Sequence, residues 1–284
     1  KKTADKYYDD NNFMDLTLYS TLGFTDEDIE SIKKIDGVDD VFATYSLDAI
    51  TKVGSSEVVV KLMGLPLDDS NYVNKYTLVD GRLPENSYEC VIEEGKINNL
   101  DISIGSKIKL ESGSSEDLSE SLENTEYEVV GKVQTPYYLS NEKGTTNIGN
   151  GKISSYIVVP LDNFKIPAYT ETYVTINGAK EFNSFSDKYF DLIDTVKISL
   201  ETLGDERAGI RYEEIINEAN KKLDESKNKL NEEKKNGEEK LNDAKKQLED
   251  AEKAIETGKE ELLKKETDYK ITIVQAENEI SLGQ

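Results

Sequence analysis

Apolar and polar residues alternate at two different spacings in the first part of the chain. The stretch MDLTLYS, residues 14–20, has apolar residues at every second position, which predicts a strand with one buried face. The isoleucines from Ile29 to Ile35 follow at helical spacing, and Thr25 with Asp28 has the spacing of a capping box. The pattern therefore predicts a strand and then a short helix.

The alternation returns in residues 41–49, and the run EVVVKLM follows after a glycine-serine turn. Residues 65–161 then contain several short apolar runs separated by turns, with a polar serine- and glutamate-rich loop near 112–125. This pattern predicts a small β-rich insert. The strand TETYVTI and a helix opened by Ser184 and capped by Asp187 follow it, so we expect an α+β subdomain interrupted by a β-rich one.

The last part of the chain, from about Asp205, contains no proline and has a seven-residue repeat. Large apolar residues alternate with alanine and glycine along one narrow stripe, which is typical of a coiled coil. Each glycine in an exposed helix costs about 1 kcal/mol relative to alanine and requires close packing in compensation. The expected interface consists of Leu241, Ala244, Leu248, Ala251, Ile255, Gly258 and Leu262.

This stripe predicts a partner helix, which is either a returning arm beyond Gln284 or another chain. One alternative is a hairpin that turns at Asn236-Gly237 and pairs residues 213–235 with 238–262. Another is a solvated single helix supported by Glu–Lys pairs.

Composition limits the classes of function. The chain has 284 residues and a net charge of −23, so nucleic acid and anionic lipid headgroups would be repelled. It has no histidine, which excludes histidine-based catalysis and zinc sites built on imidazole. The single Cys90 cannot form an intrachain disulfide and is expected in the core. No run of about 18 apolar residues and no signal peptide is present, so the sequence is expected to be a soluble piece, such as a fragment of something larger.

Three stretches suggest chemistry that the wider pattern does not support. The glycine-rich stretch KGTTNIGNGKISS, residues 143–155, lacks P-loop spacing and precedes a predicted strand, so we expect a surface loop rather than a phosphate site. The pairs Ser31 with Lys34 and Ser140 with Lys143 have the spacing of a serine–lysine nucleophile, which often arises by chance. Asp26, Glu27 and Asp28 form an acidic cluster in a first helical turn, where carboxylates favour the helix dipole. We therefore predict no catalytic, cofactor-binding or metal-binding residues.

With these pieces placed, the chain resembles the extracytoplasmic domain of FtsX/MacB-type ABC transporter permeases, in the Gram-positive version with a coiled-coil insertion. The resemblance covers essentially the whole chain, because several motifs occur in the expected order. They are TADKYYDDNNFMDLTLYSTLGFTDEDIESIKKIDGV, LVDGRLPENSYECVI, TPYYLSNEKGTTNIGNGKISSYIVVP and AKKQLEDAEKAIETGKEEL.

The resemblance implies a fold class and a division of the chain. The fold is α+β, with a porter-like α+β subdomain of residues 1–64 and 166–204 interrupted by a sabre-like β-rich subdomain of residues 65–165. Residues 205–284 would form a coiled-coil stalk helix.

The resemblance also implies a non-catalytic domain on the extracellular face of a cell membrane. A separate cytoplasmic ATPase subunit would hydrolyse ATP, and membrane helices outside this sequence would transmit the motion. Mechanotransmission through the stalk would then move an extracellular peptide, lipid or lipoprotein, or control a cell-wall enzyme. The stalk would pair with a returning helix or with a second permease subunit. The alternative hypothesis is a cell-surface adhesin or scaffold that displays its globular head on a coiled coil and self-associates through residues 241–262.

Overall fold

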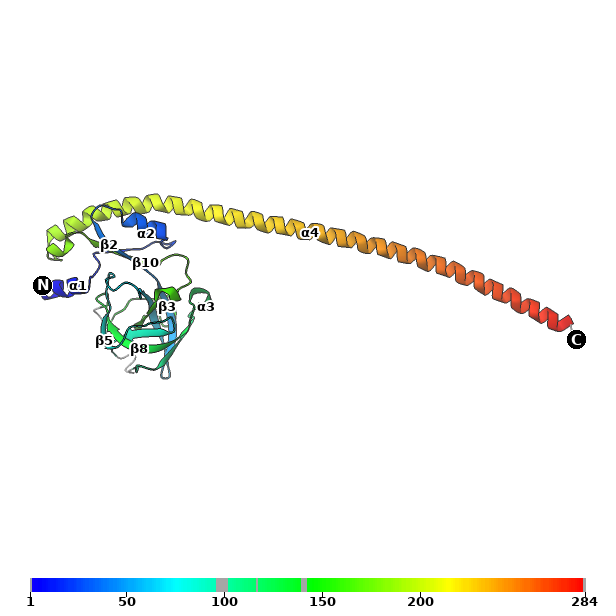
Figure 1. Cartoon of the computed structure of the whole chain (residues 1–284), viewed down its shortest axis with the longest axis horizontal. Helices are drawn as coiled ribbons and strands as arrows, with labels where there is room; N and C mark the ends of the chain where they lie inside the picture. Colours follow the sequence, from blue (N-terminus) through cyan, green and yellow to red (C-terminus); the bar gives the residue numbers. More distant parts are fainter. Residues whose placement is uncertain (1, 96–101, 116, 139–141, 283–284) are drawn as a thin grey trace. The chain divides into compact units, whose positions relative to one another are not determined.

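The computed structural model describes residues 2–95, 102–115, 117–138 and 142–282. The chain divides into two compact units, Lys1–Ala208 and Gly209–Gln284, which we call the head and the helical unit. The head contains two sheets, and the helical unit is a continuous helix (Figure 1). The architecture is therefore α+β followed by a long helix, as the sequence predicts.

The smaller sheet of the head has three antiparallel strands in the order β1-β10-β2. Helix α2 and the first turns of helix α4 cover one face of it, and their apolar residues form one core with Val174 and Ile176 of the sheet. The elements are α1 (Lys2–Asp10), β1 (Leu16–Leu18), α2 (Asp26–Ile32), β2 (Val38–Thr44), β10 (Glu171–Ile176) and α4 (Asp187–Leu282).

The larger sheet has seven strands in the order β5-β8-β6-β9-β4-β3-β7, and β7 also pairs with β8. This last pairing closes six of the strands into a ring, with β5 added at one side. The interior is apolar and includes fully buried Leu62, Cys90 and Ile157. The strands are β3 (Ser46–Val53), β4 (Ser56–Leu65), β5 (Thr77–Gly81), β6 (Glu89–Glu93), β7 (Lys107–Glu111), β8 (Glu126–Gln134) and β9 (Ser155–Pro160).

Three short helices complete the head. They are α3 (Leu118–Ser121), η1 (Leu161–Asn163) and η2 (Ala179–Glu181).

Aromatic side chains fill the space between the two sheets. Phe42 of β2 lies 5.5 Å from Tyr72 and 6.3 Å from Tyr173 of β10, measured between ring centroids. Because successive strand residues point to opposite faces, Val41 faces the helices while Phe42 faces the larger sheet. The small sheet is therefore buried on both faces.

Some predicted elements differ from the observed ones. The strand predicted at 41–49 is two strands, since β2 and β3 lie in different sheets and the chain crosses between them at Tyr45. Residues 46–64, which the sequence analysis groups with the α+β part, pair in the larger sheet. The subdomain boundaries themselves remain a prediction.

Helix α4 begins later than predicted and then stays helical through the heptad repeat, as predicted. It starts at Asp187, and the hydroxyl of Ser186 accepts a hydrogen bond from the Tyr189 N–H, whereas Ser184 binds Asp5 instead of opening the helix. The alternative turn at Asn236-Gly237 is wrong, because both residues are helical. Among the described helices, none is both long and apolar enough to span a bilayer.

Candidate functional site

The first turns of α4 are fixed in the head by apolar packing. Ile193 and Val196 are buried against Ile29 and Ile32 of α2. A Cβ atom at Gly37 would lie 2.6 Å from a methyl carbon of Val196, so this turn, with a φ of +91°, tolerates only glycine at the contact. By contrast, Phe185 is exposed and lies before the helix begins.

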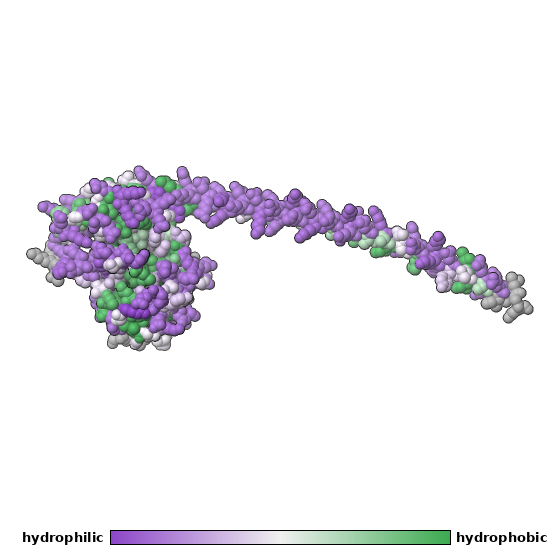
Figure 2. Space-filling view, viewed as in Figure 1, coloured by the Kyte–Doolittle hydropathy of each residue, from purple (hydrophilic) through white to green (hydrophobic). Residues whose placement is uncertain are grey.

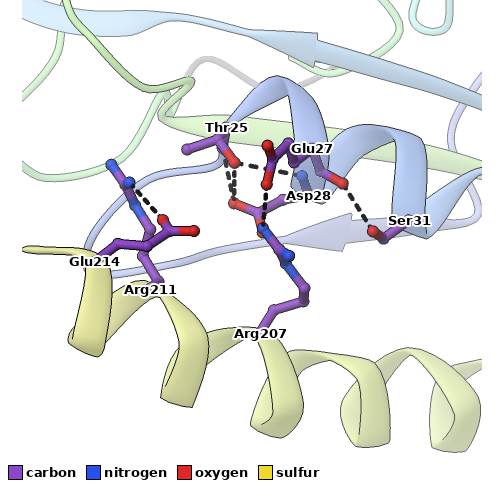
Figure 3. A network of polar contacts seen from close by, with 7 residues as sticks. All are labelled: Thr25, Glu27, Asp28, Ser31, Arg207, Arg211 and Glu214. Atoms are coloured by element: carbon purple, nitrogen blue, oxygen red, sulfur yellow. Dashed lines mark hydrogen bonds and ion pairs between the residues drawn. The ribbon is translucent and has the colours of Figure 1, made fainter.

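An ion pair joins α4 to α2 near the end of the head, at Arg207 (Figure 3). The Arg207 Nε donates to Asp28 Oδ1 at 2.5 Å, and Glu27 lies 3.6 Å from the same guanidinium. Asp28 also accepts from the backbone N–H and the hydroxyl of Thr25, which confirms the predicted capping box. Asp28 is buried, so its carboxylate depends on these donors.

The pKa of Asp28 shows which effect dominates. Burial alone would raise the pKa of this carboxyl group, but the hydrogen bonds from Thr25 and from Arg207 outweigh burial and lower it. Asp28 is therefore charged at neutral pH. The acidic cluster of residues 26–28 caps its own helix and binds Arg207.

Further hydrogen bonds join distant parts of the chain near the start of α4. The carboxylate of Asp5 accepts from Asn183 and from the hydroxyl of Ser184, at 2.8 and 2.7 Å. Asp15 accepts from the Ile176 N–H and from the hydroxyl of Tyr189, both at 2.7 Å. Burial raises the pKa of Asp15 although both hydrogen bonds oppose the shift. The segment just before α4 is thus bound to α1, and Tyr189 of α4 is bound to the residue before β1.

The seven predicted interface residues, which we call the seam, all lie on α4 in the helical unit. They are exposed, and the exposed fractions of Leu241, Leu248, Ile255 and Leu262 lie between 56% and 68%. At about 100° per residue the seven occupy an arc of about 100°. The structure therefore places them on one face of a helix; their role as an interface remains a prediction.

The same face extends further toward the head than the sequence analysis predicts. Ile216, Leu223 and Leu230 precede Gly237 at seven-residue intervals, and this register continues without a break through Ala244 and the following small residues of the seam. All three are exposed. Their spacing was the signal that could have identified them.

Polar residues cover most of the helical unit (Figure 2). Near its start the Arg211 guanidinium pairs with Glu214 one turn later on the same helix, at 3.1 Å (Figure 3).

Apolar residues gather toward the C-terminal end of the helical unit (Figure 2). The exposed ones there are Leu262, Leu263, Tyr269, Ile271, Ile273 and Val274.

The other sequence candidates have structural roles in the head. The glycine-rich stretch folds back on itself through a bridge between Thr145 and Lys152, and the strand β9 follows it, as predicted. Lys143 is buried and pairs with Glu93 at 2.7 Å. The hydroxyl of Ser31 donates to the Glu27 carbonyl one turn earlier, so it is engaged within its own helix. Ser140 lies outside the described residues.

A polar cavity of about 510 Å³ lies in the head where α1 meets β2. Among the described residues no group of three or more His, Cys, Asp or Glu could hold a metal ion. Its lining residues are Asp9, Asp10, Asn12, Asp39, Asp40, Asn71, Lys75 and Lys180.

No protein-family model and no curated protein sequence matches the chain significantly. Several solved structures are similar to it, including the following two. One is the extracellular domain of the noncanonical ABC-type transporter YknZ from Gram-positive bacteria, with 18% identity, a TM-score of 0.35, and coverage of 62% of this chain and 85% of that one. The other is the periplasmic region of MacB from Actinobacillus actinomycetemcomitans, with 15% identity, a TM-score of 0.33, and coverage of 63% and 75%. At such values the similarity assigns no function.

Proposed function

We propose that this chain is the extracellular domain of an ABC transporter permease subunit and that it transmits motion without catalysis. The observation that supports this most directly is the continuity of α4. The helix begins in the core of the head, is bound there by Ile193, Val196 and Arg207, and continues unbroken into the helical unit. A helix anchored in this way is suited to passing displacement along its length, because its backbone hydrogen bonds resist bending.

The sequence resemblance gives this mechanical element its context. In the proposed mechanism a cytoplasmic ATPase subunit supplies the energy, and the permease passes the resulting motion to the head and α4. The exposed seam would engage a partner helix, since a large-small heptad stripe favours close helix packing. The cargo or target would be an extracellular peptide, lipid, lipoprotein or cell-wall enzyme.

Two insertions of equal length test the transmission. In the intact permease with its ATPase, a flexible seven-residue Gly/Ser insertion after Ala219 breaks the helix. A matched control duplicates residues 220–226 and so preserves both the helix and the heptad register. We expect the flexible insertion to abolish ATP-dependent transport or enzyme activation, and the duplication to retain it, with membrane levels and ATP hydrolysis measured in parallel.

A flexible insertion that functions as well as the duplication would contradict transmission through α4. An adhesin or scaffold, in turn, would lack any response to ATP hydrolysis in both variants.

A further inference from the structure

The exposed seam is complementary to itself when two copies of the helix run in opposite directions. The relevant centre lies between Glu249 and Asp250, and residues equally distant from it on the two copies face each other. With this centre Leu241 faces Gly258 of the second copy, and Leu248 faces Ala251. Every layer from 237 to 262 then places one large side chain against one small one, so two backbones can approach closely without gaps or clashes.

The charges beside the seam select the same alignment. The heptad positions e and g flank the seam on its two sides. In an antiparallel coiled coil the e positions of one helix lie beside the e positions of the other, and the g positions lie beside the g positions. Flanking residues lie between the seam layers, so the nearest flanking pairs are displaced by about two residues from the reflection that pairs the layers: Lys245 lies beside Glu252 of the second copy, and the two charges attract. Two-fold symmetry makes each pair occur twice. Between residues 238 and 261 all three charged pairs are opposite in sign: Glu238 with Lys259, Lys240 with Glu261, and Lys245 with Glu252.

Neighbouring alignments bring like charges together. A shift by one heptad in one direction places Lys245 opposite Lys259, and a shift in the other direction places Glu238 opposite Glu252. Like charges facing each other are destabilising. The charge pattern therefore favours one antiparallel register over the two adjacent ones.

Both the packing of the layers and the charges beside the seam disfavour a parallel pair. In register, each large residue would face its own copy and each small residue would face another small one, which leaves gaps at Ala244 and Ala251. In a parallel pair each g position lies beside the e position five residues later on the second copy. Lys240 would then contact Lys245 of the second copy, and Glu261 would contact its Glu266. Both contacts are repulsive.

We propose that the seam binds a second copy of this chain in antiparallel orientation, centred between Glu249 and Asp250. The exposure of the large seam residues leaves this face available for such a contact in the helical unit. The pair forms between chains that approach from opposite directions, not between neighbours whose helices run the same way. This inference rests on the part of the proposed function that makes the seam an interface, and it is independent of transport.

Analytical ultracentrifugation of the whole chain, with three sets of variants, tests the partner and its direction. Ala251→Leu keeps the helix propensity but overfills two layers of the antiparallel pair. We therefore expect the dissociation constant of the dimer to rise at least about tenfold. In a parallel pair the same change would fill a gap and tighten the dimer.

Charge exchange tests the register. Lys245→Glu and Glu252→Lys each create two like-charge contacts and should each weaken the dimer about tenfold, whereas the double exchange should restore it. The matched control is Lys246→Glu, which lies on the opposite side of the helix and should leave the dissociation constant within about twofold.

Cross-linking gives a direct distance. A short bis-maleimide should join a Lys245→Cys chain to a Glu252→Cys chain when the two are mixed, and should not join either variant to itself. The native Cys90 is fully buried and does not interfere.

A chain that remains monomeric at high concentration would overturn the inference, and so would a dimer that Ala251→Leu tightens or that the double exchange fails to restore. Such a result leaves the insertion test of transport unaffected. Conversely, a dimer that forms as expected beside a functional flexible insertion would refute transmission alone.

Discussion

Replacing Arg207 by methionine should weaken the attachment of α4 to the head. The substitution keeps most of the aliphatic volume of the side chain and its helix propensity but removes the guanidinium that faces Asp28. The carboxylate of Asp28 would then remain in a site where only 9% of its side chain is exposed. Thr25 would still donate two hydrogen bonds to it.

The size of the effect follows from this partial compensation. Removing one partner of a fully buried ion pair costs about 3–5 kcal/mol, because the remaining charge is left without compensation. The Arg207 side chain is 18% exposed, and Asp28 keeps its bonds to Thr25, so both effects reduce the cost. We expect a loss of about 2 kcal/mol in the free energy of unfolding of the head.

Urea unfolding of the full chain, followed by near-UV circular dichroism, measures this loss. The sequence has 16 tyrosines and no tryptophan, and the tyrosines packed between the sheets report on tertiary structure in the head. With a slope of about 2 kcal/mol per molar urea, the midpoint should fall by about 1 M. The control is Lys222→Met, which removes an exposed pair with Glu218 on α4 and should leave the midpoint nearly unchanged.

The pH dependence gives an independent check. The folded pKa of Asp28 is lower than its ordinary value of 3.8, so its ionised form stabilises the fold. This contribution is fully present above pH 3.8 and is lost as the pH falls through the lower folded pKa. The difference between wild type and the Arg207→Met variant should therefore be constant above pH 3.8 and decrease below it.

The reasoning would be refuted by an unchanged midpoint, or by an equal loss in the Lys222→Met control. A double-mutant cycle with Asp28→Asn separates the ion pair from packing. In the Asp28→Asn background the loss caused by Arg207→Met should be clearly smaller, because no buried charge is left without its partner.

Three other outcomes are expected in the head. Gly64→Ala should destabilise the head by about 1–3 kcal/mol, because a Cβ would lie 2.4 Å from a leucine side chain. Gly204→Ala, in an open helical position, should stabilise it by up to about 1 kcal/mol. Thermal unfolding of the two variants measures both changes. Lys143→Met should cost about 2–3 kcal/mol and expose the glycine-rich loop to proteolysis, because Glu93 loses a buried partner; an unchanged cleavage pattern would contradict this. Burial raises the pKa of the Cys90 thiol, so iodoacetamide should modify it only after unfolding, as mass spectrometry can determine.

Local patterns were sufficient for several elements of this protein. The capping box at Thr25 and Asp28 is formed as predicted, because it involves residues three apart and depends on no distant contact. The strand after the glycine-rich loop and the helical character of the C-terminal region are also local properties, set by β-branched runs and by the heptad repeat.

Other features required the fold. Alternation from Val41 to Ala49 is uniform in the sequence, yet the chain leaves one sheet and enters another at Tyr45, because register depends on strands far away in the sequence. Helix α1 and the edge strand β5 were not predicted, since α1 has only nine residues and β5 is exposed along its whole length.

Helical periodicity alone specifies the seam, because it places Leu241 and Leu248 on one face wherever the helix lies. Tertiary packing brings Arg207 to Asp28, 179 residues away, and this contact makes the acidic turn an anchor for α4. The physical reason is that spacing along the chain fixes neighbours within one helix, whereas an ion pair between two helices depends on how the whole core packs.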